Sequence, residues 1–276
     1  SIVKGIRFDG TDQFIRLGDS PDLELGYIVP LRSLRAITCW VYFDEFSNNA
    51  HILDFGNGPG RDNVFLGIVG RGDANISAED IRPDPCQAES TLPTGPSGPQ
   101  PVAEVTPQEL MRTTSANVDE FTCRGFETQP RRLPPSRVVP WQPRNLTKKA
   151  SLLYEIWDKQ QRKMRIKIDG VIPRRKWVHI AITATDMASF RPAIKVYIDG
   201  EDVFTKPSGF LPQASTTTNN YFGKSNWSND TSQYENKDEL FNGSLFDVRG
   251  YKLPMTAKKV KDTYEWGKKQ LGLNQE

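Results

Sequence analysis

The sequence predicts an all-β protein, a two-sheet antiparallel jelly-roll sandwich with a long proline-rich insertion and a short C-terminal helix. Two stretches near the middle of the chain, residues 177–183 and 194–200, carry this prediction. Each alternates large apolar residues with polar or small ones, which is the period of a half-buried β-strand. The second stretch ends in Asp199-Gly200, a strong hairpin signal between alternating strands. No segment between the strand-like runs has the length and period of a crossover helix, which argues against a parallel sheet.

Strand-like runs recur along the chain, and Gly, Asn, Asp or Pro separates most of them, as is typical of a sandwich. The first two surround a turn, at residues 6–10 and 14–17. The further expected strands cover residues 34–43, 51–55, 64–69, 151–157, 164–168, 177–183, 194–198, 203–204, 220–223 and 244–251. Thr256 is a good N-cap and is followed by Val260, Tyr264 and Leu271 at helical spacings. We therefore expect a C-terminal helix over residues 256–271.

A proline-rich segment interrupts the strand pattern at residues 83–148. Twelve of the 20 prolines fall between Pro83 and Pro143. Because proline fixes φ and removes a backbone donor, this segment is not expected to enter the middle of a sheet. We interpret it as an insertion that lies against its own domain or a neighbouring subunit. Cys86 and Cys123 bracket part of it and form the candidate disulfide, although sequence alone does not show that their Cβ atoms meet.

Composition excludes several classes of protein. The chain has 36 basic and 34 acidic residues, so its net charge of +2 predicts no nucleic-acid footprint. The clustered basic pairs are interpreted as solvated faces. No apolar run approaches the length that spans a bilayer. Three cysteines are too few for a disulfide-built scaffold, and Cys39 is expected to be a small buried apolar residue.

Six segments follow one another in an order that is typical of a known family. They are residues 8–10, 36–41, 177–181, 196–200, 221–223 and 241–249. Their order resembles laminin-G-like domains, which belong to the concanavalin A-like lectin and glucanase superfamily. The resemblance covers residues 1–82 and 150–266, and it implies two antiparallel sheets of about a dozen strands. We therefore expect one laminin-G-like jelly roll over residues 1–276, interrupted at 83–148.

The resemblance raises the question of glycoside hydrolysis, because some members of the superfamily are hydrolases. Those enzymes place their carboxylates on one strand as Glu-x-Asp-x-Glu, and no such run occurs here. The closest run, Glu155-Ile156-Trp157-Asp158, has the wrong spacing to put both carboxylates on one face. His51 and His179 are the only histidines, and neither stands near a Ser or Cys in a nucleophile motif. We expect no enzymatic activity and no catalytic residue.

The resemblance also makes calcium the one cofactor to consider. Laminin-G-like domains often bind it at a rim through one acidic side chain, backbone carbonyls and a second polar side chain. Asp62, just before the strand at 64–68, stands where that acidic ligand is expected. Calcium takes six or more oxygen ligands, so a turn aspartate that accepts backbone hydrogen bonds stays open as the other interpretation of Asp62.

Three aromatic residues in polar surroundings are the candidate binding residues, Trp141, Trp227 and Tyr234.

We interpret the protein as a non-enzymatic structural or interaction protein. It would dock onto neighbouring subunits of a larger assembly, such as a virion or another multi-subunit particle, through its insertion and rim loops. The alternative is a carbohydrate-binding lectin, for which dependence on calcium stays open, and the second alternative is a secreted glycosidase. The expected partners are other protein subunits, with glycans under the lectin alternative. An extracellular place or a place within a large particle is favoured, and the source compartment stays open.

Overall fold

Two antiparallel sheets of six strands make up the part of the chain that the computed structural model describes, residues 5–17, 31–72, 149–185, 191–213, 216–228 and 238–273. In spatial order, sheet A holds β1 (Ile6–Asp9), β12 (Asn242–Tyr251), β3 (Ala36–Phe43), β8 (Trp177–Ala184), β9 (Ile194–Ile198) and β10 (Glu201–Lys206). Sheet B holds β2 (Ile15–Arg16), β11 (Asn219–Phe222), β4 (His51–Gly56), β5 (Val64–Ile68), β6 (Lys149–Trp157) and β7 (Lys163–Pro173). A short 3-10 turn, η1 (Leu31–Ser33), precedes β3. The predicted all-β sandwich is confirmed.

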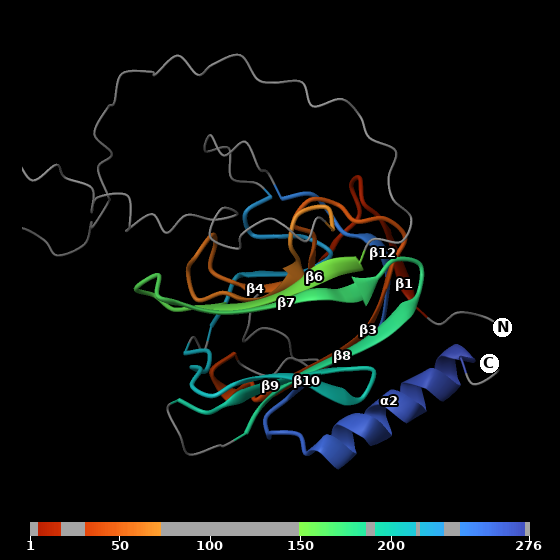
Figure 1. Cartoon of the computed structure of the whole chain (residues 1–276). Coiled ribbons are helices and arrows are strands. Elements are labelled where there is room, and N and C mark those ends of the chain that lie inside the picture. Colours follow the sequence, from red (N-terminus) through yellow and green to blue (C-terminus); the bar gives the residue numbers. More distant parts are fainter. Residues whose placement is uncertain are drawn as a thin grey trace, which may run out of the picture. The chain divides into compact units, whose positions relative to one another are not determined.

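The core lies between the two sheets, which form the two strand layers in Figure 1. Alternate residues of each strand point into it, as the period of two requires. The fully buried members include Phe8, Val41, Phe43, Ile52, Leu66, Leu152, Ile180, Val196 and Phe241. Three aromatic rings interlock edge to face at one place, with centroids 5.5 Å apart for Phe8 and Phe241 and 4.9 Å apart for Phe43 and Phe241. Such pairs contribute beyond the area that they bury.

The hairpin between β9 and β10 forms at the predicted dipeptide. Ile198 pairs with Glu201, so Asp199 and Gly200 are the two loop residues. Both have positive φ, 52° and 84°, as a type I′ turn demands. The Asp199 side chain also accepts a hydrogen bond from the backbone N–H of His179 at 2.8 Å. The turn is therefore fastened to the neighbouring strand β8.

Helix α2 (Ala257–Leu271) lies along the outer face of sheet A, beside β8, β9 and β10 in Figure 1. Thr256 is its N-cap, as predicted, because its hydroxyl accepts a hydrogen bond from the backbone N–H of Lys259 at 3.2 Å. The fully buried Val260 packs with Ala36, Ala181, Tyr197 and Met255. Both faces of sheet A are thus covered, one by sheet B and the other by α2. The helices within the described residues include none that is long and apolar enough to cross a membrane.

Several sequence predictions lie outside the described residues. These are the insertion at 83–148, the cysteine pair Cys86 and Cys123, and two of the candidate aromatic residues, Trp141 and Tyr234. Each of them stays a prediction. Cys39, in contrast, is described and is a buried free cysteine, as expected.

Candidate functional site

A hollow of about 500 Å³ opens where the edges of the two sheets meet, and we call it the basic cleft. Its volume lies within the range of about 300–1,000 Å³ that small-molecule sites occupy. Its lining residues are Asp158, Arg162, Lys163, Met164, Arg165, Arg191, Lys206, Ser208, Gly209, Phe210 and Gln213. Five of these eleven residues are cationic and one is anionic. Basic residues are thus the commonest type along its lining, which also has a small apolar part.

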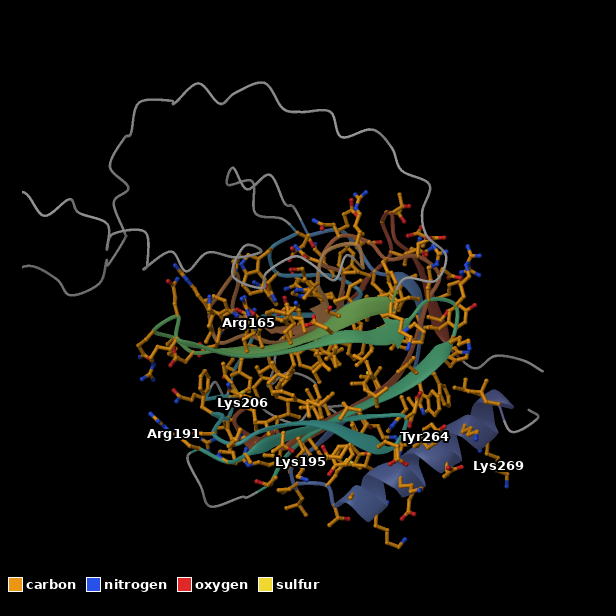
Figure 2. All side chains as sticks on the ribbon, in the orientation of Figure 1. Arg165, Arg191, Lys195, Lys206, Tyr264 and Lys269 are labelled. Atoms are coloured by element: carbon orange, nitrogen blue, oxygen red, sulfur yellow. The ribbon has the colours of Figure 1, made fainter. Side chains whose placement is uncertain are left out.

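The cleft takes its walls from the last strand of each sheet. β7 is the edge strand of sheet B, and β10 is an edge strand of sheet A. Lys206 pairs in register with Ile194, which belongs to the core, so Lys206 lies on the inner face of sheet A. Arg165, Lys206 and Arg191 follow one another from the upper sheet to the lower one in Figure 2. The cleft therefore spans the gap between the two sheets.

The β6–β7 turn forms one wall, and Asp158 holds it in shape. One carboxylate oxygen of Asp158 accepts hydrogen bonds from the backbone N–H groups of Gln160 and Arg162, both at 2.9 Å. The other oxygen accepts from Nε of Arg162 at 2.7 Å. Asp158 is itself buried, whereas the Arg162 side chain is 68% exposed. Asp158 thus fixes the conformation of the turn, and the Arg162 side chain extends from it into solvent.

Glu155 of β6 and Arg165 of β7 form a buried ion pair next to this turn. Glu155 is fully buried and accepts a hydrogen bond from Nε1 of Trp157 at 2.7 Å. It also accepts a hydrogen bond from Nε of Arg165. Lys163 lies 5.3 Å from the centroid of the Trp157 ring, a cation–π contact. Glu155 and Trp157 lie on the outer face of sheet B, so these contacts hold the charged ends of Arg165 and Lys163 on that face and not in the space between the sheets.

The apolar part of the cleft comes from the chain that follows β10. Gly209 donates its backbone N–H to the carbonyl of Pro192 at 2.9 Å. This brings it so close to Met164 and Ile194 that a Cβ built on it would lie within 2.7 Å of both side chains. Phe210 then packs against the core. The arrangement offers an apolar surface beside charged and amide groups, which suits a polar ligand with apolar faces.

The two carboxylates near the cleft make no acid–base pair. Glu155 is paired with Arg165, and Asp158 is held by Arg162 and by backbone donors. Glycoside hydrolysis needs two carboxylates that flank the scissile bond, one of them able to donate a proton. Asp158 and Glu155 therefore act as anchors of the β6–β7 hairpin.

Asp62 lies in the β4–β5 loop, directly before β5, as predicted. It takes a left-handed backbone with φ of 54° and is buried. One carboxylate oxygen accepts from Nδ2 of Asn57 at 3.3 Å, while the other has no hydrogen-bond partner among the described residues. No group of three His, Cys, Asp or Glu side chains suited to a metal occurs in the described part of the chain. Calcium at Asp62 stays a prediction, and calorimetric titration of the wild type and Asp62→Asn tests it.

Trp227 is the one candidate aromatic residue that the structure describes, and it is partly buried on the outer face of sheet B. Its ring centroid lies 5.5 Å from that of Phe65 and 6.0 Å from that of Trp157. These contacts fasten the loop after β11 to the sheet. Trp227 does not line the basic cleft, so its binding role stays a separate prediction.

A buried polar network on the same outer face brings together residues that are distant in sequence. His51 contacts Asp54, with Nδ1 3.0 Å from Oδ2, and its Nε2 is 3.7 Å from Oδ2 of Asp238. Asp54 accepts from the backbone N–H of Asn226 at 2.8 Å, and Asp238 accepts from the hydroxyl of Ser225 at 2.6 Å. The serine donates to a carboxylate and not to the histidine, and all these groups are buried. The network therefore anchors a loop and lacks the geometry of an activated nucleophile.

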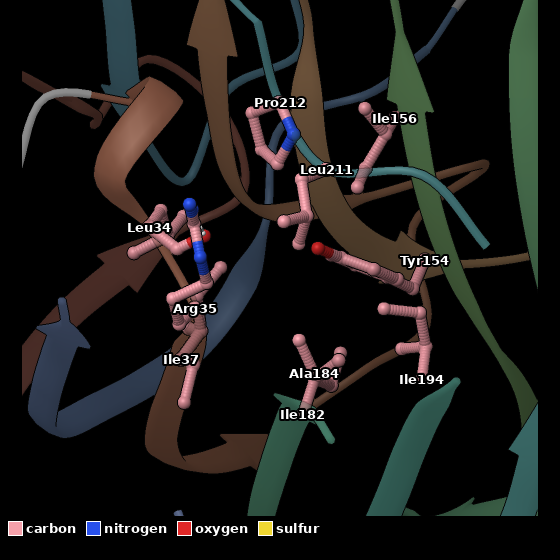
Figure 3. Close-up of a pocket in the computed structure, with 11 residues that line it drawn as sticks. Leu34, Arg35, Ile37, Tyr154, Ile156, Ile182, Ala184, Ile194, Leu211 and Pro212 are labelled. Atoms are coloured by element: carbon pink, nitrogen blue, oxygen red, sulfur yellow. Dashed lines mark hydrogen bonds between the residues drawn. The ribbon is translucent and has the colours of Figure 1, made fainter. Parts of the chain in front are cut away.

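A second hollow, of about 10 Å³, lies inside one end of the core. Figure 3 shows the hydroxyl of Tyr154 directed into it, between Leu211 and Arg35. Burial raises the pKa of this hydroxyl above its ordinary value. The space is close to that of a single water molecule, so it is a packing defect and no ligand site.

The sequence gives only one signal for the basic cleft, the run Arg162-Lys163-Met164-Arg165. The other cations, Arg191 and Lys206, are isolated in sequence and join this run only in the folded chain. Sequence reasoning therefore missed the site.

Comparison with known proteins agrees with this fold. Residues 142–261 match the family model of the concanavalin A-like lectin/glucanases superfamily. The resemblance that the sequence predicted is confirmed over that part of the chain. No curated protein matches the sequence.

Three of the similar solved structures illustrate the comparison. The CBM40 domain of the IT-sialidase of Ruminococcus gnavus superposes with a TM-score of 0.50 at 12% identity, over 94% of this chain and 96% of that one. Domain 4 of a GH43 extracellular arabinanase from Geobacillus stearothermophilus, in complex with arabinotriose, has a TM-score of 0.44 at 15% identity. The match covers 94% of this chain and 75% of the arabinanase domain chain. A heptameric SAP-like pentraxin from Limulus polyphemus has a TM-score of 0.46 at 11% identity, and the match covers 94% of this chain and 81% of the pentraxin chain. At 12% identity the likeness to the CBM40 domain is one of fold.

Proposed function

We propose that this protein is a non-catalytic carbohydrate-binding module and that the basic cleft is its binding site. The observation that carries the proposal is the cleft itself, an open hollow of about 500 Å³ at the joined edges of a lectin-like sandwich. The match to the concanavalin A-like lectin/glucanases superfamily supports the same class of function.

The lining of the cleft suits the two chemical faces of a sugar. Sugars present C–H groups on the faces of the ring and hydroxyl groups around its edge. Phe210 and Met164 supply apolar surface for the first, and Ser208, Gln213 and the cations supply hydrogen-bond donors and acceptors for the second. Ser208 and Gln213 are exposed, so a ligand reaches them directly.

The docking role in a larger assembly is a different proposal that rests on the insertion at 83–148. That segment lies outside the described residues, so nothing in the structure supports the role. The carbohydrate-binding alternative has the cleft and the family match in its favour. We therefore rank it first.

A glycan array probed with the purified full-length chain tests the proposal. We expect binding to a restricted set of glycans, and weaker binding by the double variant Ser208→Ala/Gln213→Ala. Gln270→Ala is the control, because Gln270 is an exposed residue of α2 and lines no part of the cleft. An array without any signal, or equal losses in both variants, would contradict carbohydrate binding at the cleft. Release of reducing ends from a bound glycan would contradict the non-catalytic part.

A further inference from the structure

We propose that helix α2 is a releasable cover on the outer face of sheet A, and that protonation of the buried His179 loosens it as the pH falls. Release leaves the sandwich folded and uncovers the outer face of β3 and β8. This conformational change is independent of carbohydrate binding at the basic cleft.

The contact between α2 and sheet A is separate from the main core. Val260 of the helix is fully buried and packs with Ala36, Ala181, Tyr197 and Met255. Among the described residues, the core between the two sheets includes none from α2. Departure of the helix therefore leaves that core intact, as expected of a segment that opens as a unit of its own.

Four buried polar atoms at this contact have no hydrogen-bond partner among the described residues. They are Oγ1 of Thr38, Nε1 of Trp40 and both ring nitrogens of His179. Thr38 lies between Ala36 and Trp40 on the outer face of β3, and both of these neighbours contact the helix. Each such atom weakens the contact, because it gains hydrogen bonds to water once the helix leaves. Apolar packing therefore holds α2 in place against this cost.

His179 is the ionisable group beneath the helix. Its ring centroid lies 5.3 Å from that of Trp40 and 5.9 Å from that of Tyr264, which projects from α2 toward sheet A in Figure 2. Asp199 faces it from the β9–β10 turn and accepts a hydrogen bond from its backbone N–H. Lys268 of α2 lies 5.9 Å from the Tyr264 ring. No carboxylate bonds to the imidazole within the described residues, so a proton there is a buried charge without a counter-ion.

The direction of the pH effect follows from burial. Burial lowers the pKa of His179 from 6.5 to about 4 while the helix covers it. The uncovered imidazole returns toward its ordinary pKa, so the released state binds the proton more tightly. The helix is therefore held most firmly above pH 6.5 and more weakly as the pH falls toward 4. These two pKa values make the ratio of covered to released helix about 20-fold lower at pH 5 than at pH 7.

Asp199 opposes part of this effect. Burial raises the pKa of its carboxyl group, so its contribution favours the covered state at acidic pH. We therefore expect a net loss of at least about fivefold between pH 7 and pH 5. Asp199→Asn removes the opposing group and should enlarge the loss.

Hydrogen–deuterium exchange of the full chain at pH 7 and pH 5, corrected for the intrinsic exchange rate at each pH, tests the release. We expect the amides of residues 257–271 to lose at least about fivefold in protection at pH 5, while those of β3 and β8 keep theirs. Unchanged protection of the helix would overturn the proposal. An equal loss in the helix and the strands would identify global unfolding and would overturn it as well.

Two variants at the same contact assign the effect to the imidazole. His179→Phe keeps a ring beneath the helix and removes the titration, so its helix should be protected equally at pH 7 and pH 5. Tyr264→Phe is the matched control, because it keeps the ring contact and His179, and it should lose protection as the wild type does. A loss in His179→Phe as large as in the wild type would refute the role of His179.

A second measurement on the wild type covers the case in which His179→Phe does not fold. The chain has only two histidines, His51 and His179, so NMR resolves two imidazole titrations. We expect the His179 ring to stay neutral well below pH 6.5 as long as the helix amides are protected. A His179 ring that titrates near pH 6.5 beneath a protected helix would contradict the proposal.

Discussion

The imidazole of His179 lies beneath helix α2, with its ring centroid 5.3 Å from that of Trp40. Tyr264 of the helix packs on the same two rings, at 5.9 Å from His179 and 5.5 Å from Trp40. His179 is fully buried, and neither of its ring nitrogens has a hydrogen-bond partner among the described residues. Three aromatic rings therefore join the helix to sheet A, and one of them is titratable.

The first prediction concerns the pH dependence of stability. Burial lowers the pKa of His179 from 6.5 to about 4. Because the folded-state pKa lies below the unfolded value, this stabilisation is complete above pH 6.5 and is lost as the pH falls toward 4. At pH 4.5 the loss attributable to His179 is about 2 kcal/mol in the free energy of unfolding. Urea unfolding at pH 7 and pH 4.5 measures it.

The variant His179→Phe isolates this contribution, since it keeps an aromatic ring and removes the ionisable nitrogens. We expect its stability to fall less between pH 7 and pH 4.5 than that of the wild type. Asp199 touches the same strand, and burial raises the pKa of its carboxyl group, so it acts in the opposite direction in both proteins. Equal acid sensitivity of the two proteins would refute the role of His179.

The second prediction concerns Gly267, the residue of α2 that faces Trp40. A Cβ built on Gly267 would overlap the indole, with Cε2 only 2.7 Å away. Gly→Ala in an exposed helix stabilises by up to about 1 kcal/mol, but here the added methyl must push the helix from the sheet. We expect Gly267→Ala to destabilise the protein by about 1–3 kcal/mol. Denaturant unfolding measures the change in the free energy of unfolding. The control Glu265→Ala, in the same helix, should change that free energy by less than about 0.5 kcal/mol.

The third prediction concerns the β9–β10 hairpin. Asp199 combines a left-handed backbone with a side-chain acceptor for the N–H of His179. Asparagine provides both features, and alanine provides neither. We expect Asp199→Ala to cost about 1–2 kcal/mol and Asp199→Asn to cost less than half of that. Thermal unfolding of the two variants compares them, and equal losses would show that the carboxylate charge matters more than the turn geometry.

The hairpin also shows which parts of the fold are predictable from sequence. A two-residue loop between alternating strands needs positive φ at both positions, and Asp-Gly meets that local demand. The N-cap at Thr256 is equally local, because its hydroxyl bonds to the backbone three residues later. Both were therefore predicted at the residues where they occur. The strand at 203–204 was predicted too short, since pairing with β9 extends β10 to Glu201–Lys206.

The basic cleft depends on tertiary structure and was not predictable in the same way. Arg165 and Lys206 lie 41 positions apart in sequence and border the same hollow only because β7 and β10 are edge strands of facing sheets. Arg174 and Arg175 form one of the basic pairs that were expected on a solvated face, and both are paired with Glu45. The cleft combines one basic run, residues 162–165, with two cations that are isolated in sequence, Arg191 and Lys206.

The fourth prediction separates Trp227 from the cleft. Since its ring packs with Phe65 and Trp157, we expect Trp227→Ala to destabilise the protein by about 2–4 kcal/mol. Glycan affinity measured on the folded fraction should stay within about threefold of the wild type. Trp227→Phe serves as the control, because it keeps most of the packing. Lost affinity with unchanged stability would instead assign Trp227 to the binding site, as the sequence predicted.

The last prediction concerns Gly209, which allows the chain after β10 to reach the space between the sheets. An alanine Cβ there would lie 2.6 Å from Cγ1 of Ile194 and 2.7 Å from Sδ of Met164. Both side chains belong to the core, so the chain around Gly209 and Phe210 must move outward to relieve the overlap. We expect Gly209→Ala to lower the free energy of unfolding by about 1–3 kcal/mol and to weaken glycan binding, because the apolar part of the cleft shifts. Ser208→Ala, one residue earlier and exposed, should leave stability within about 0.5 kcal/mol of the wild type. A Gly209→Ala protein that loses stability but binds the glycan unchanged would place the ligand elsewhere than against Phe210.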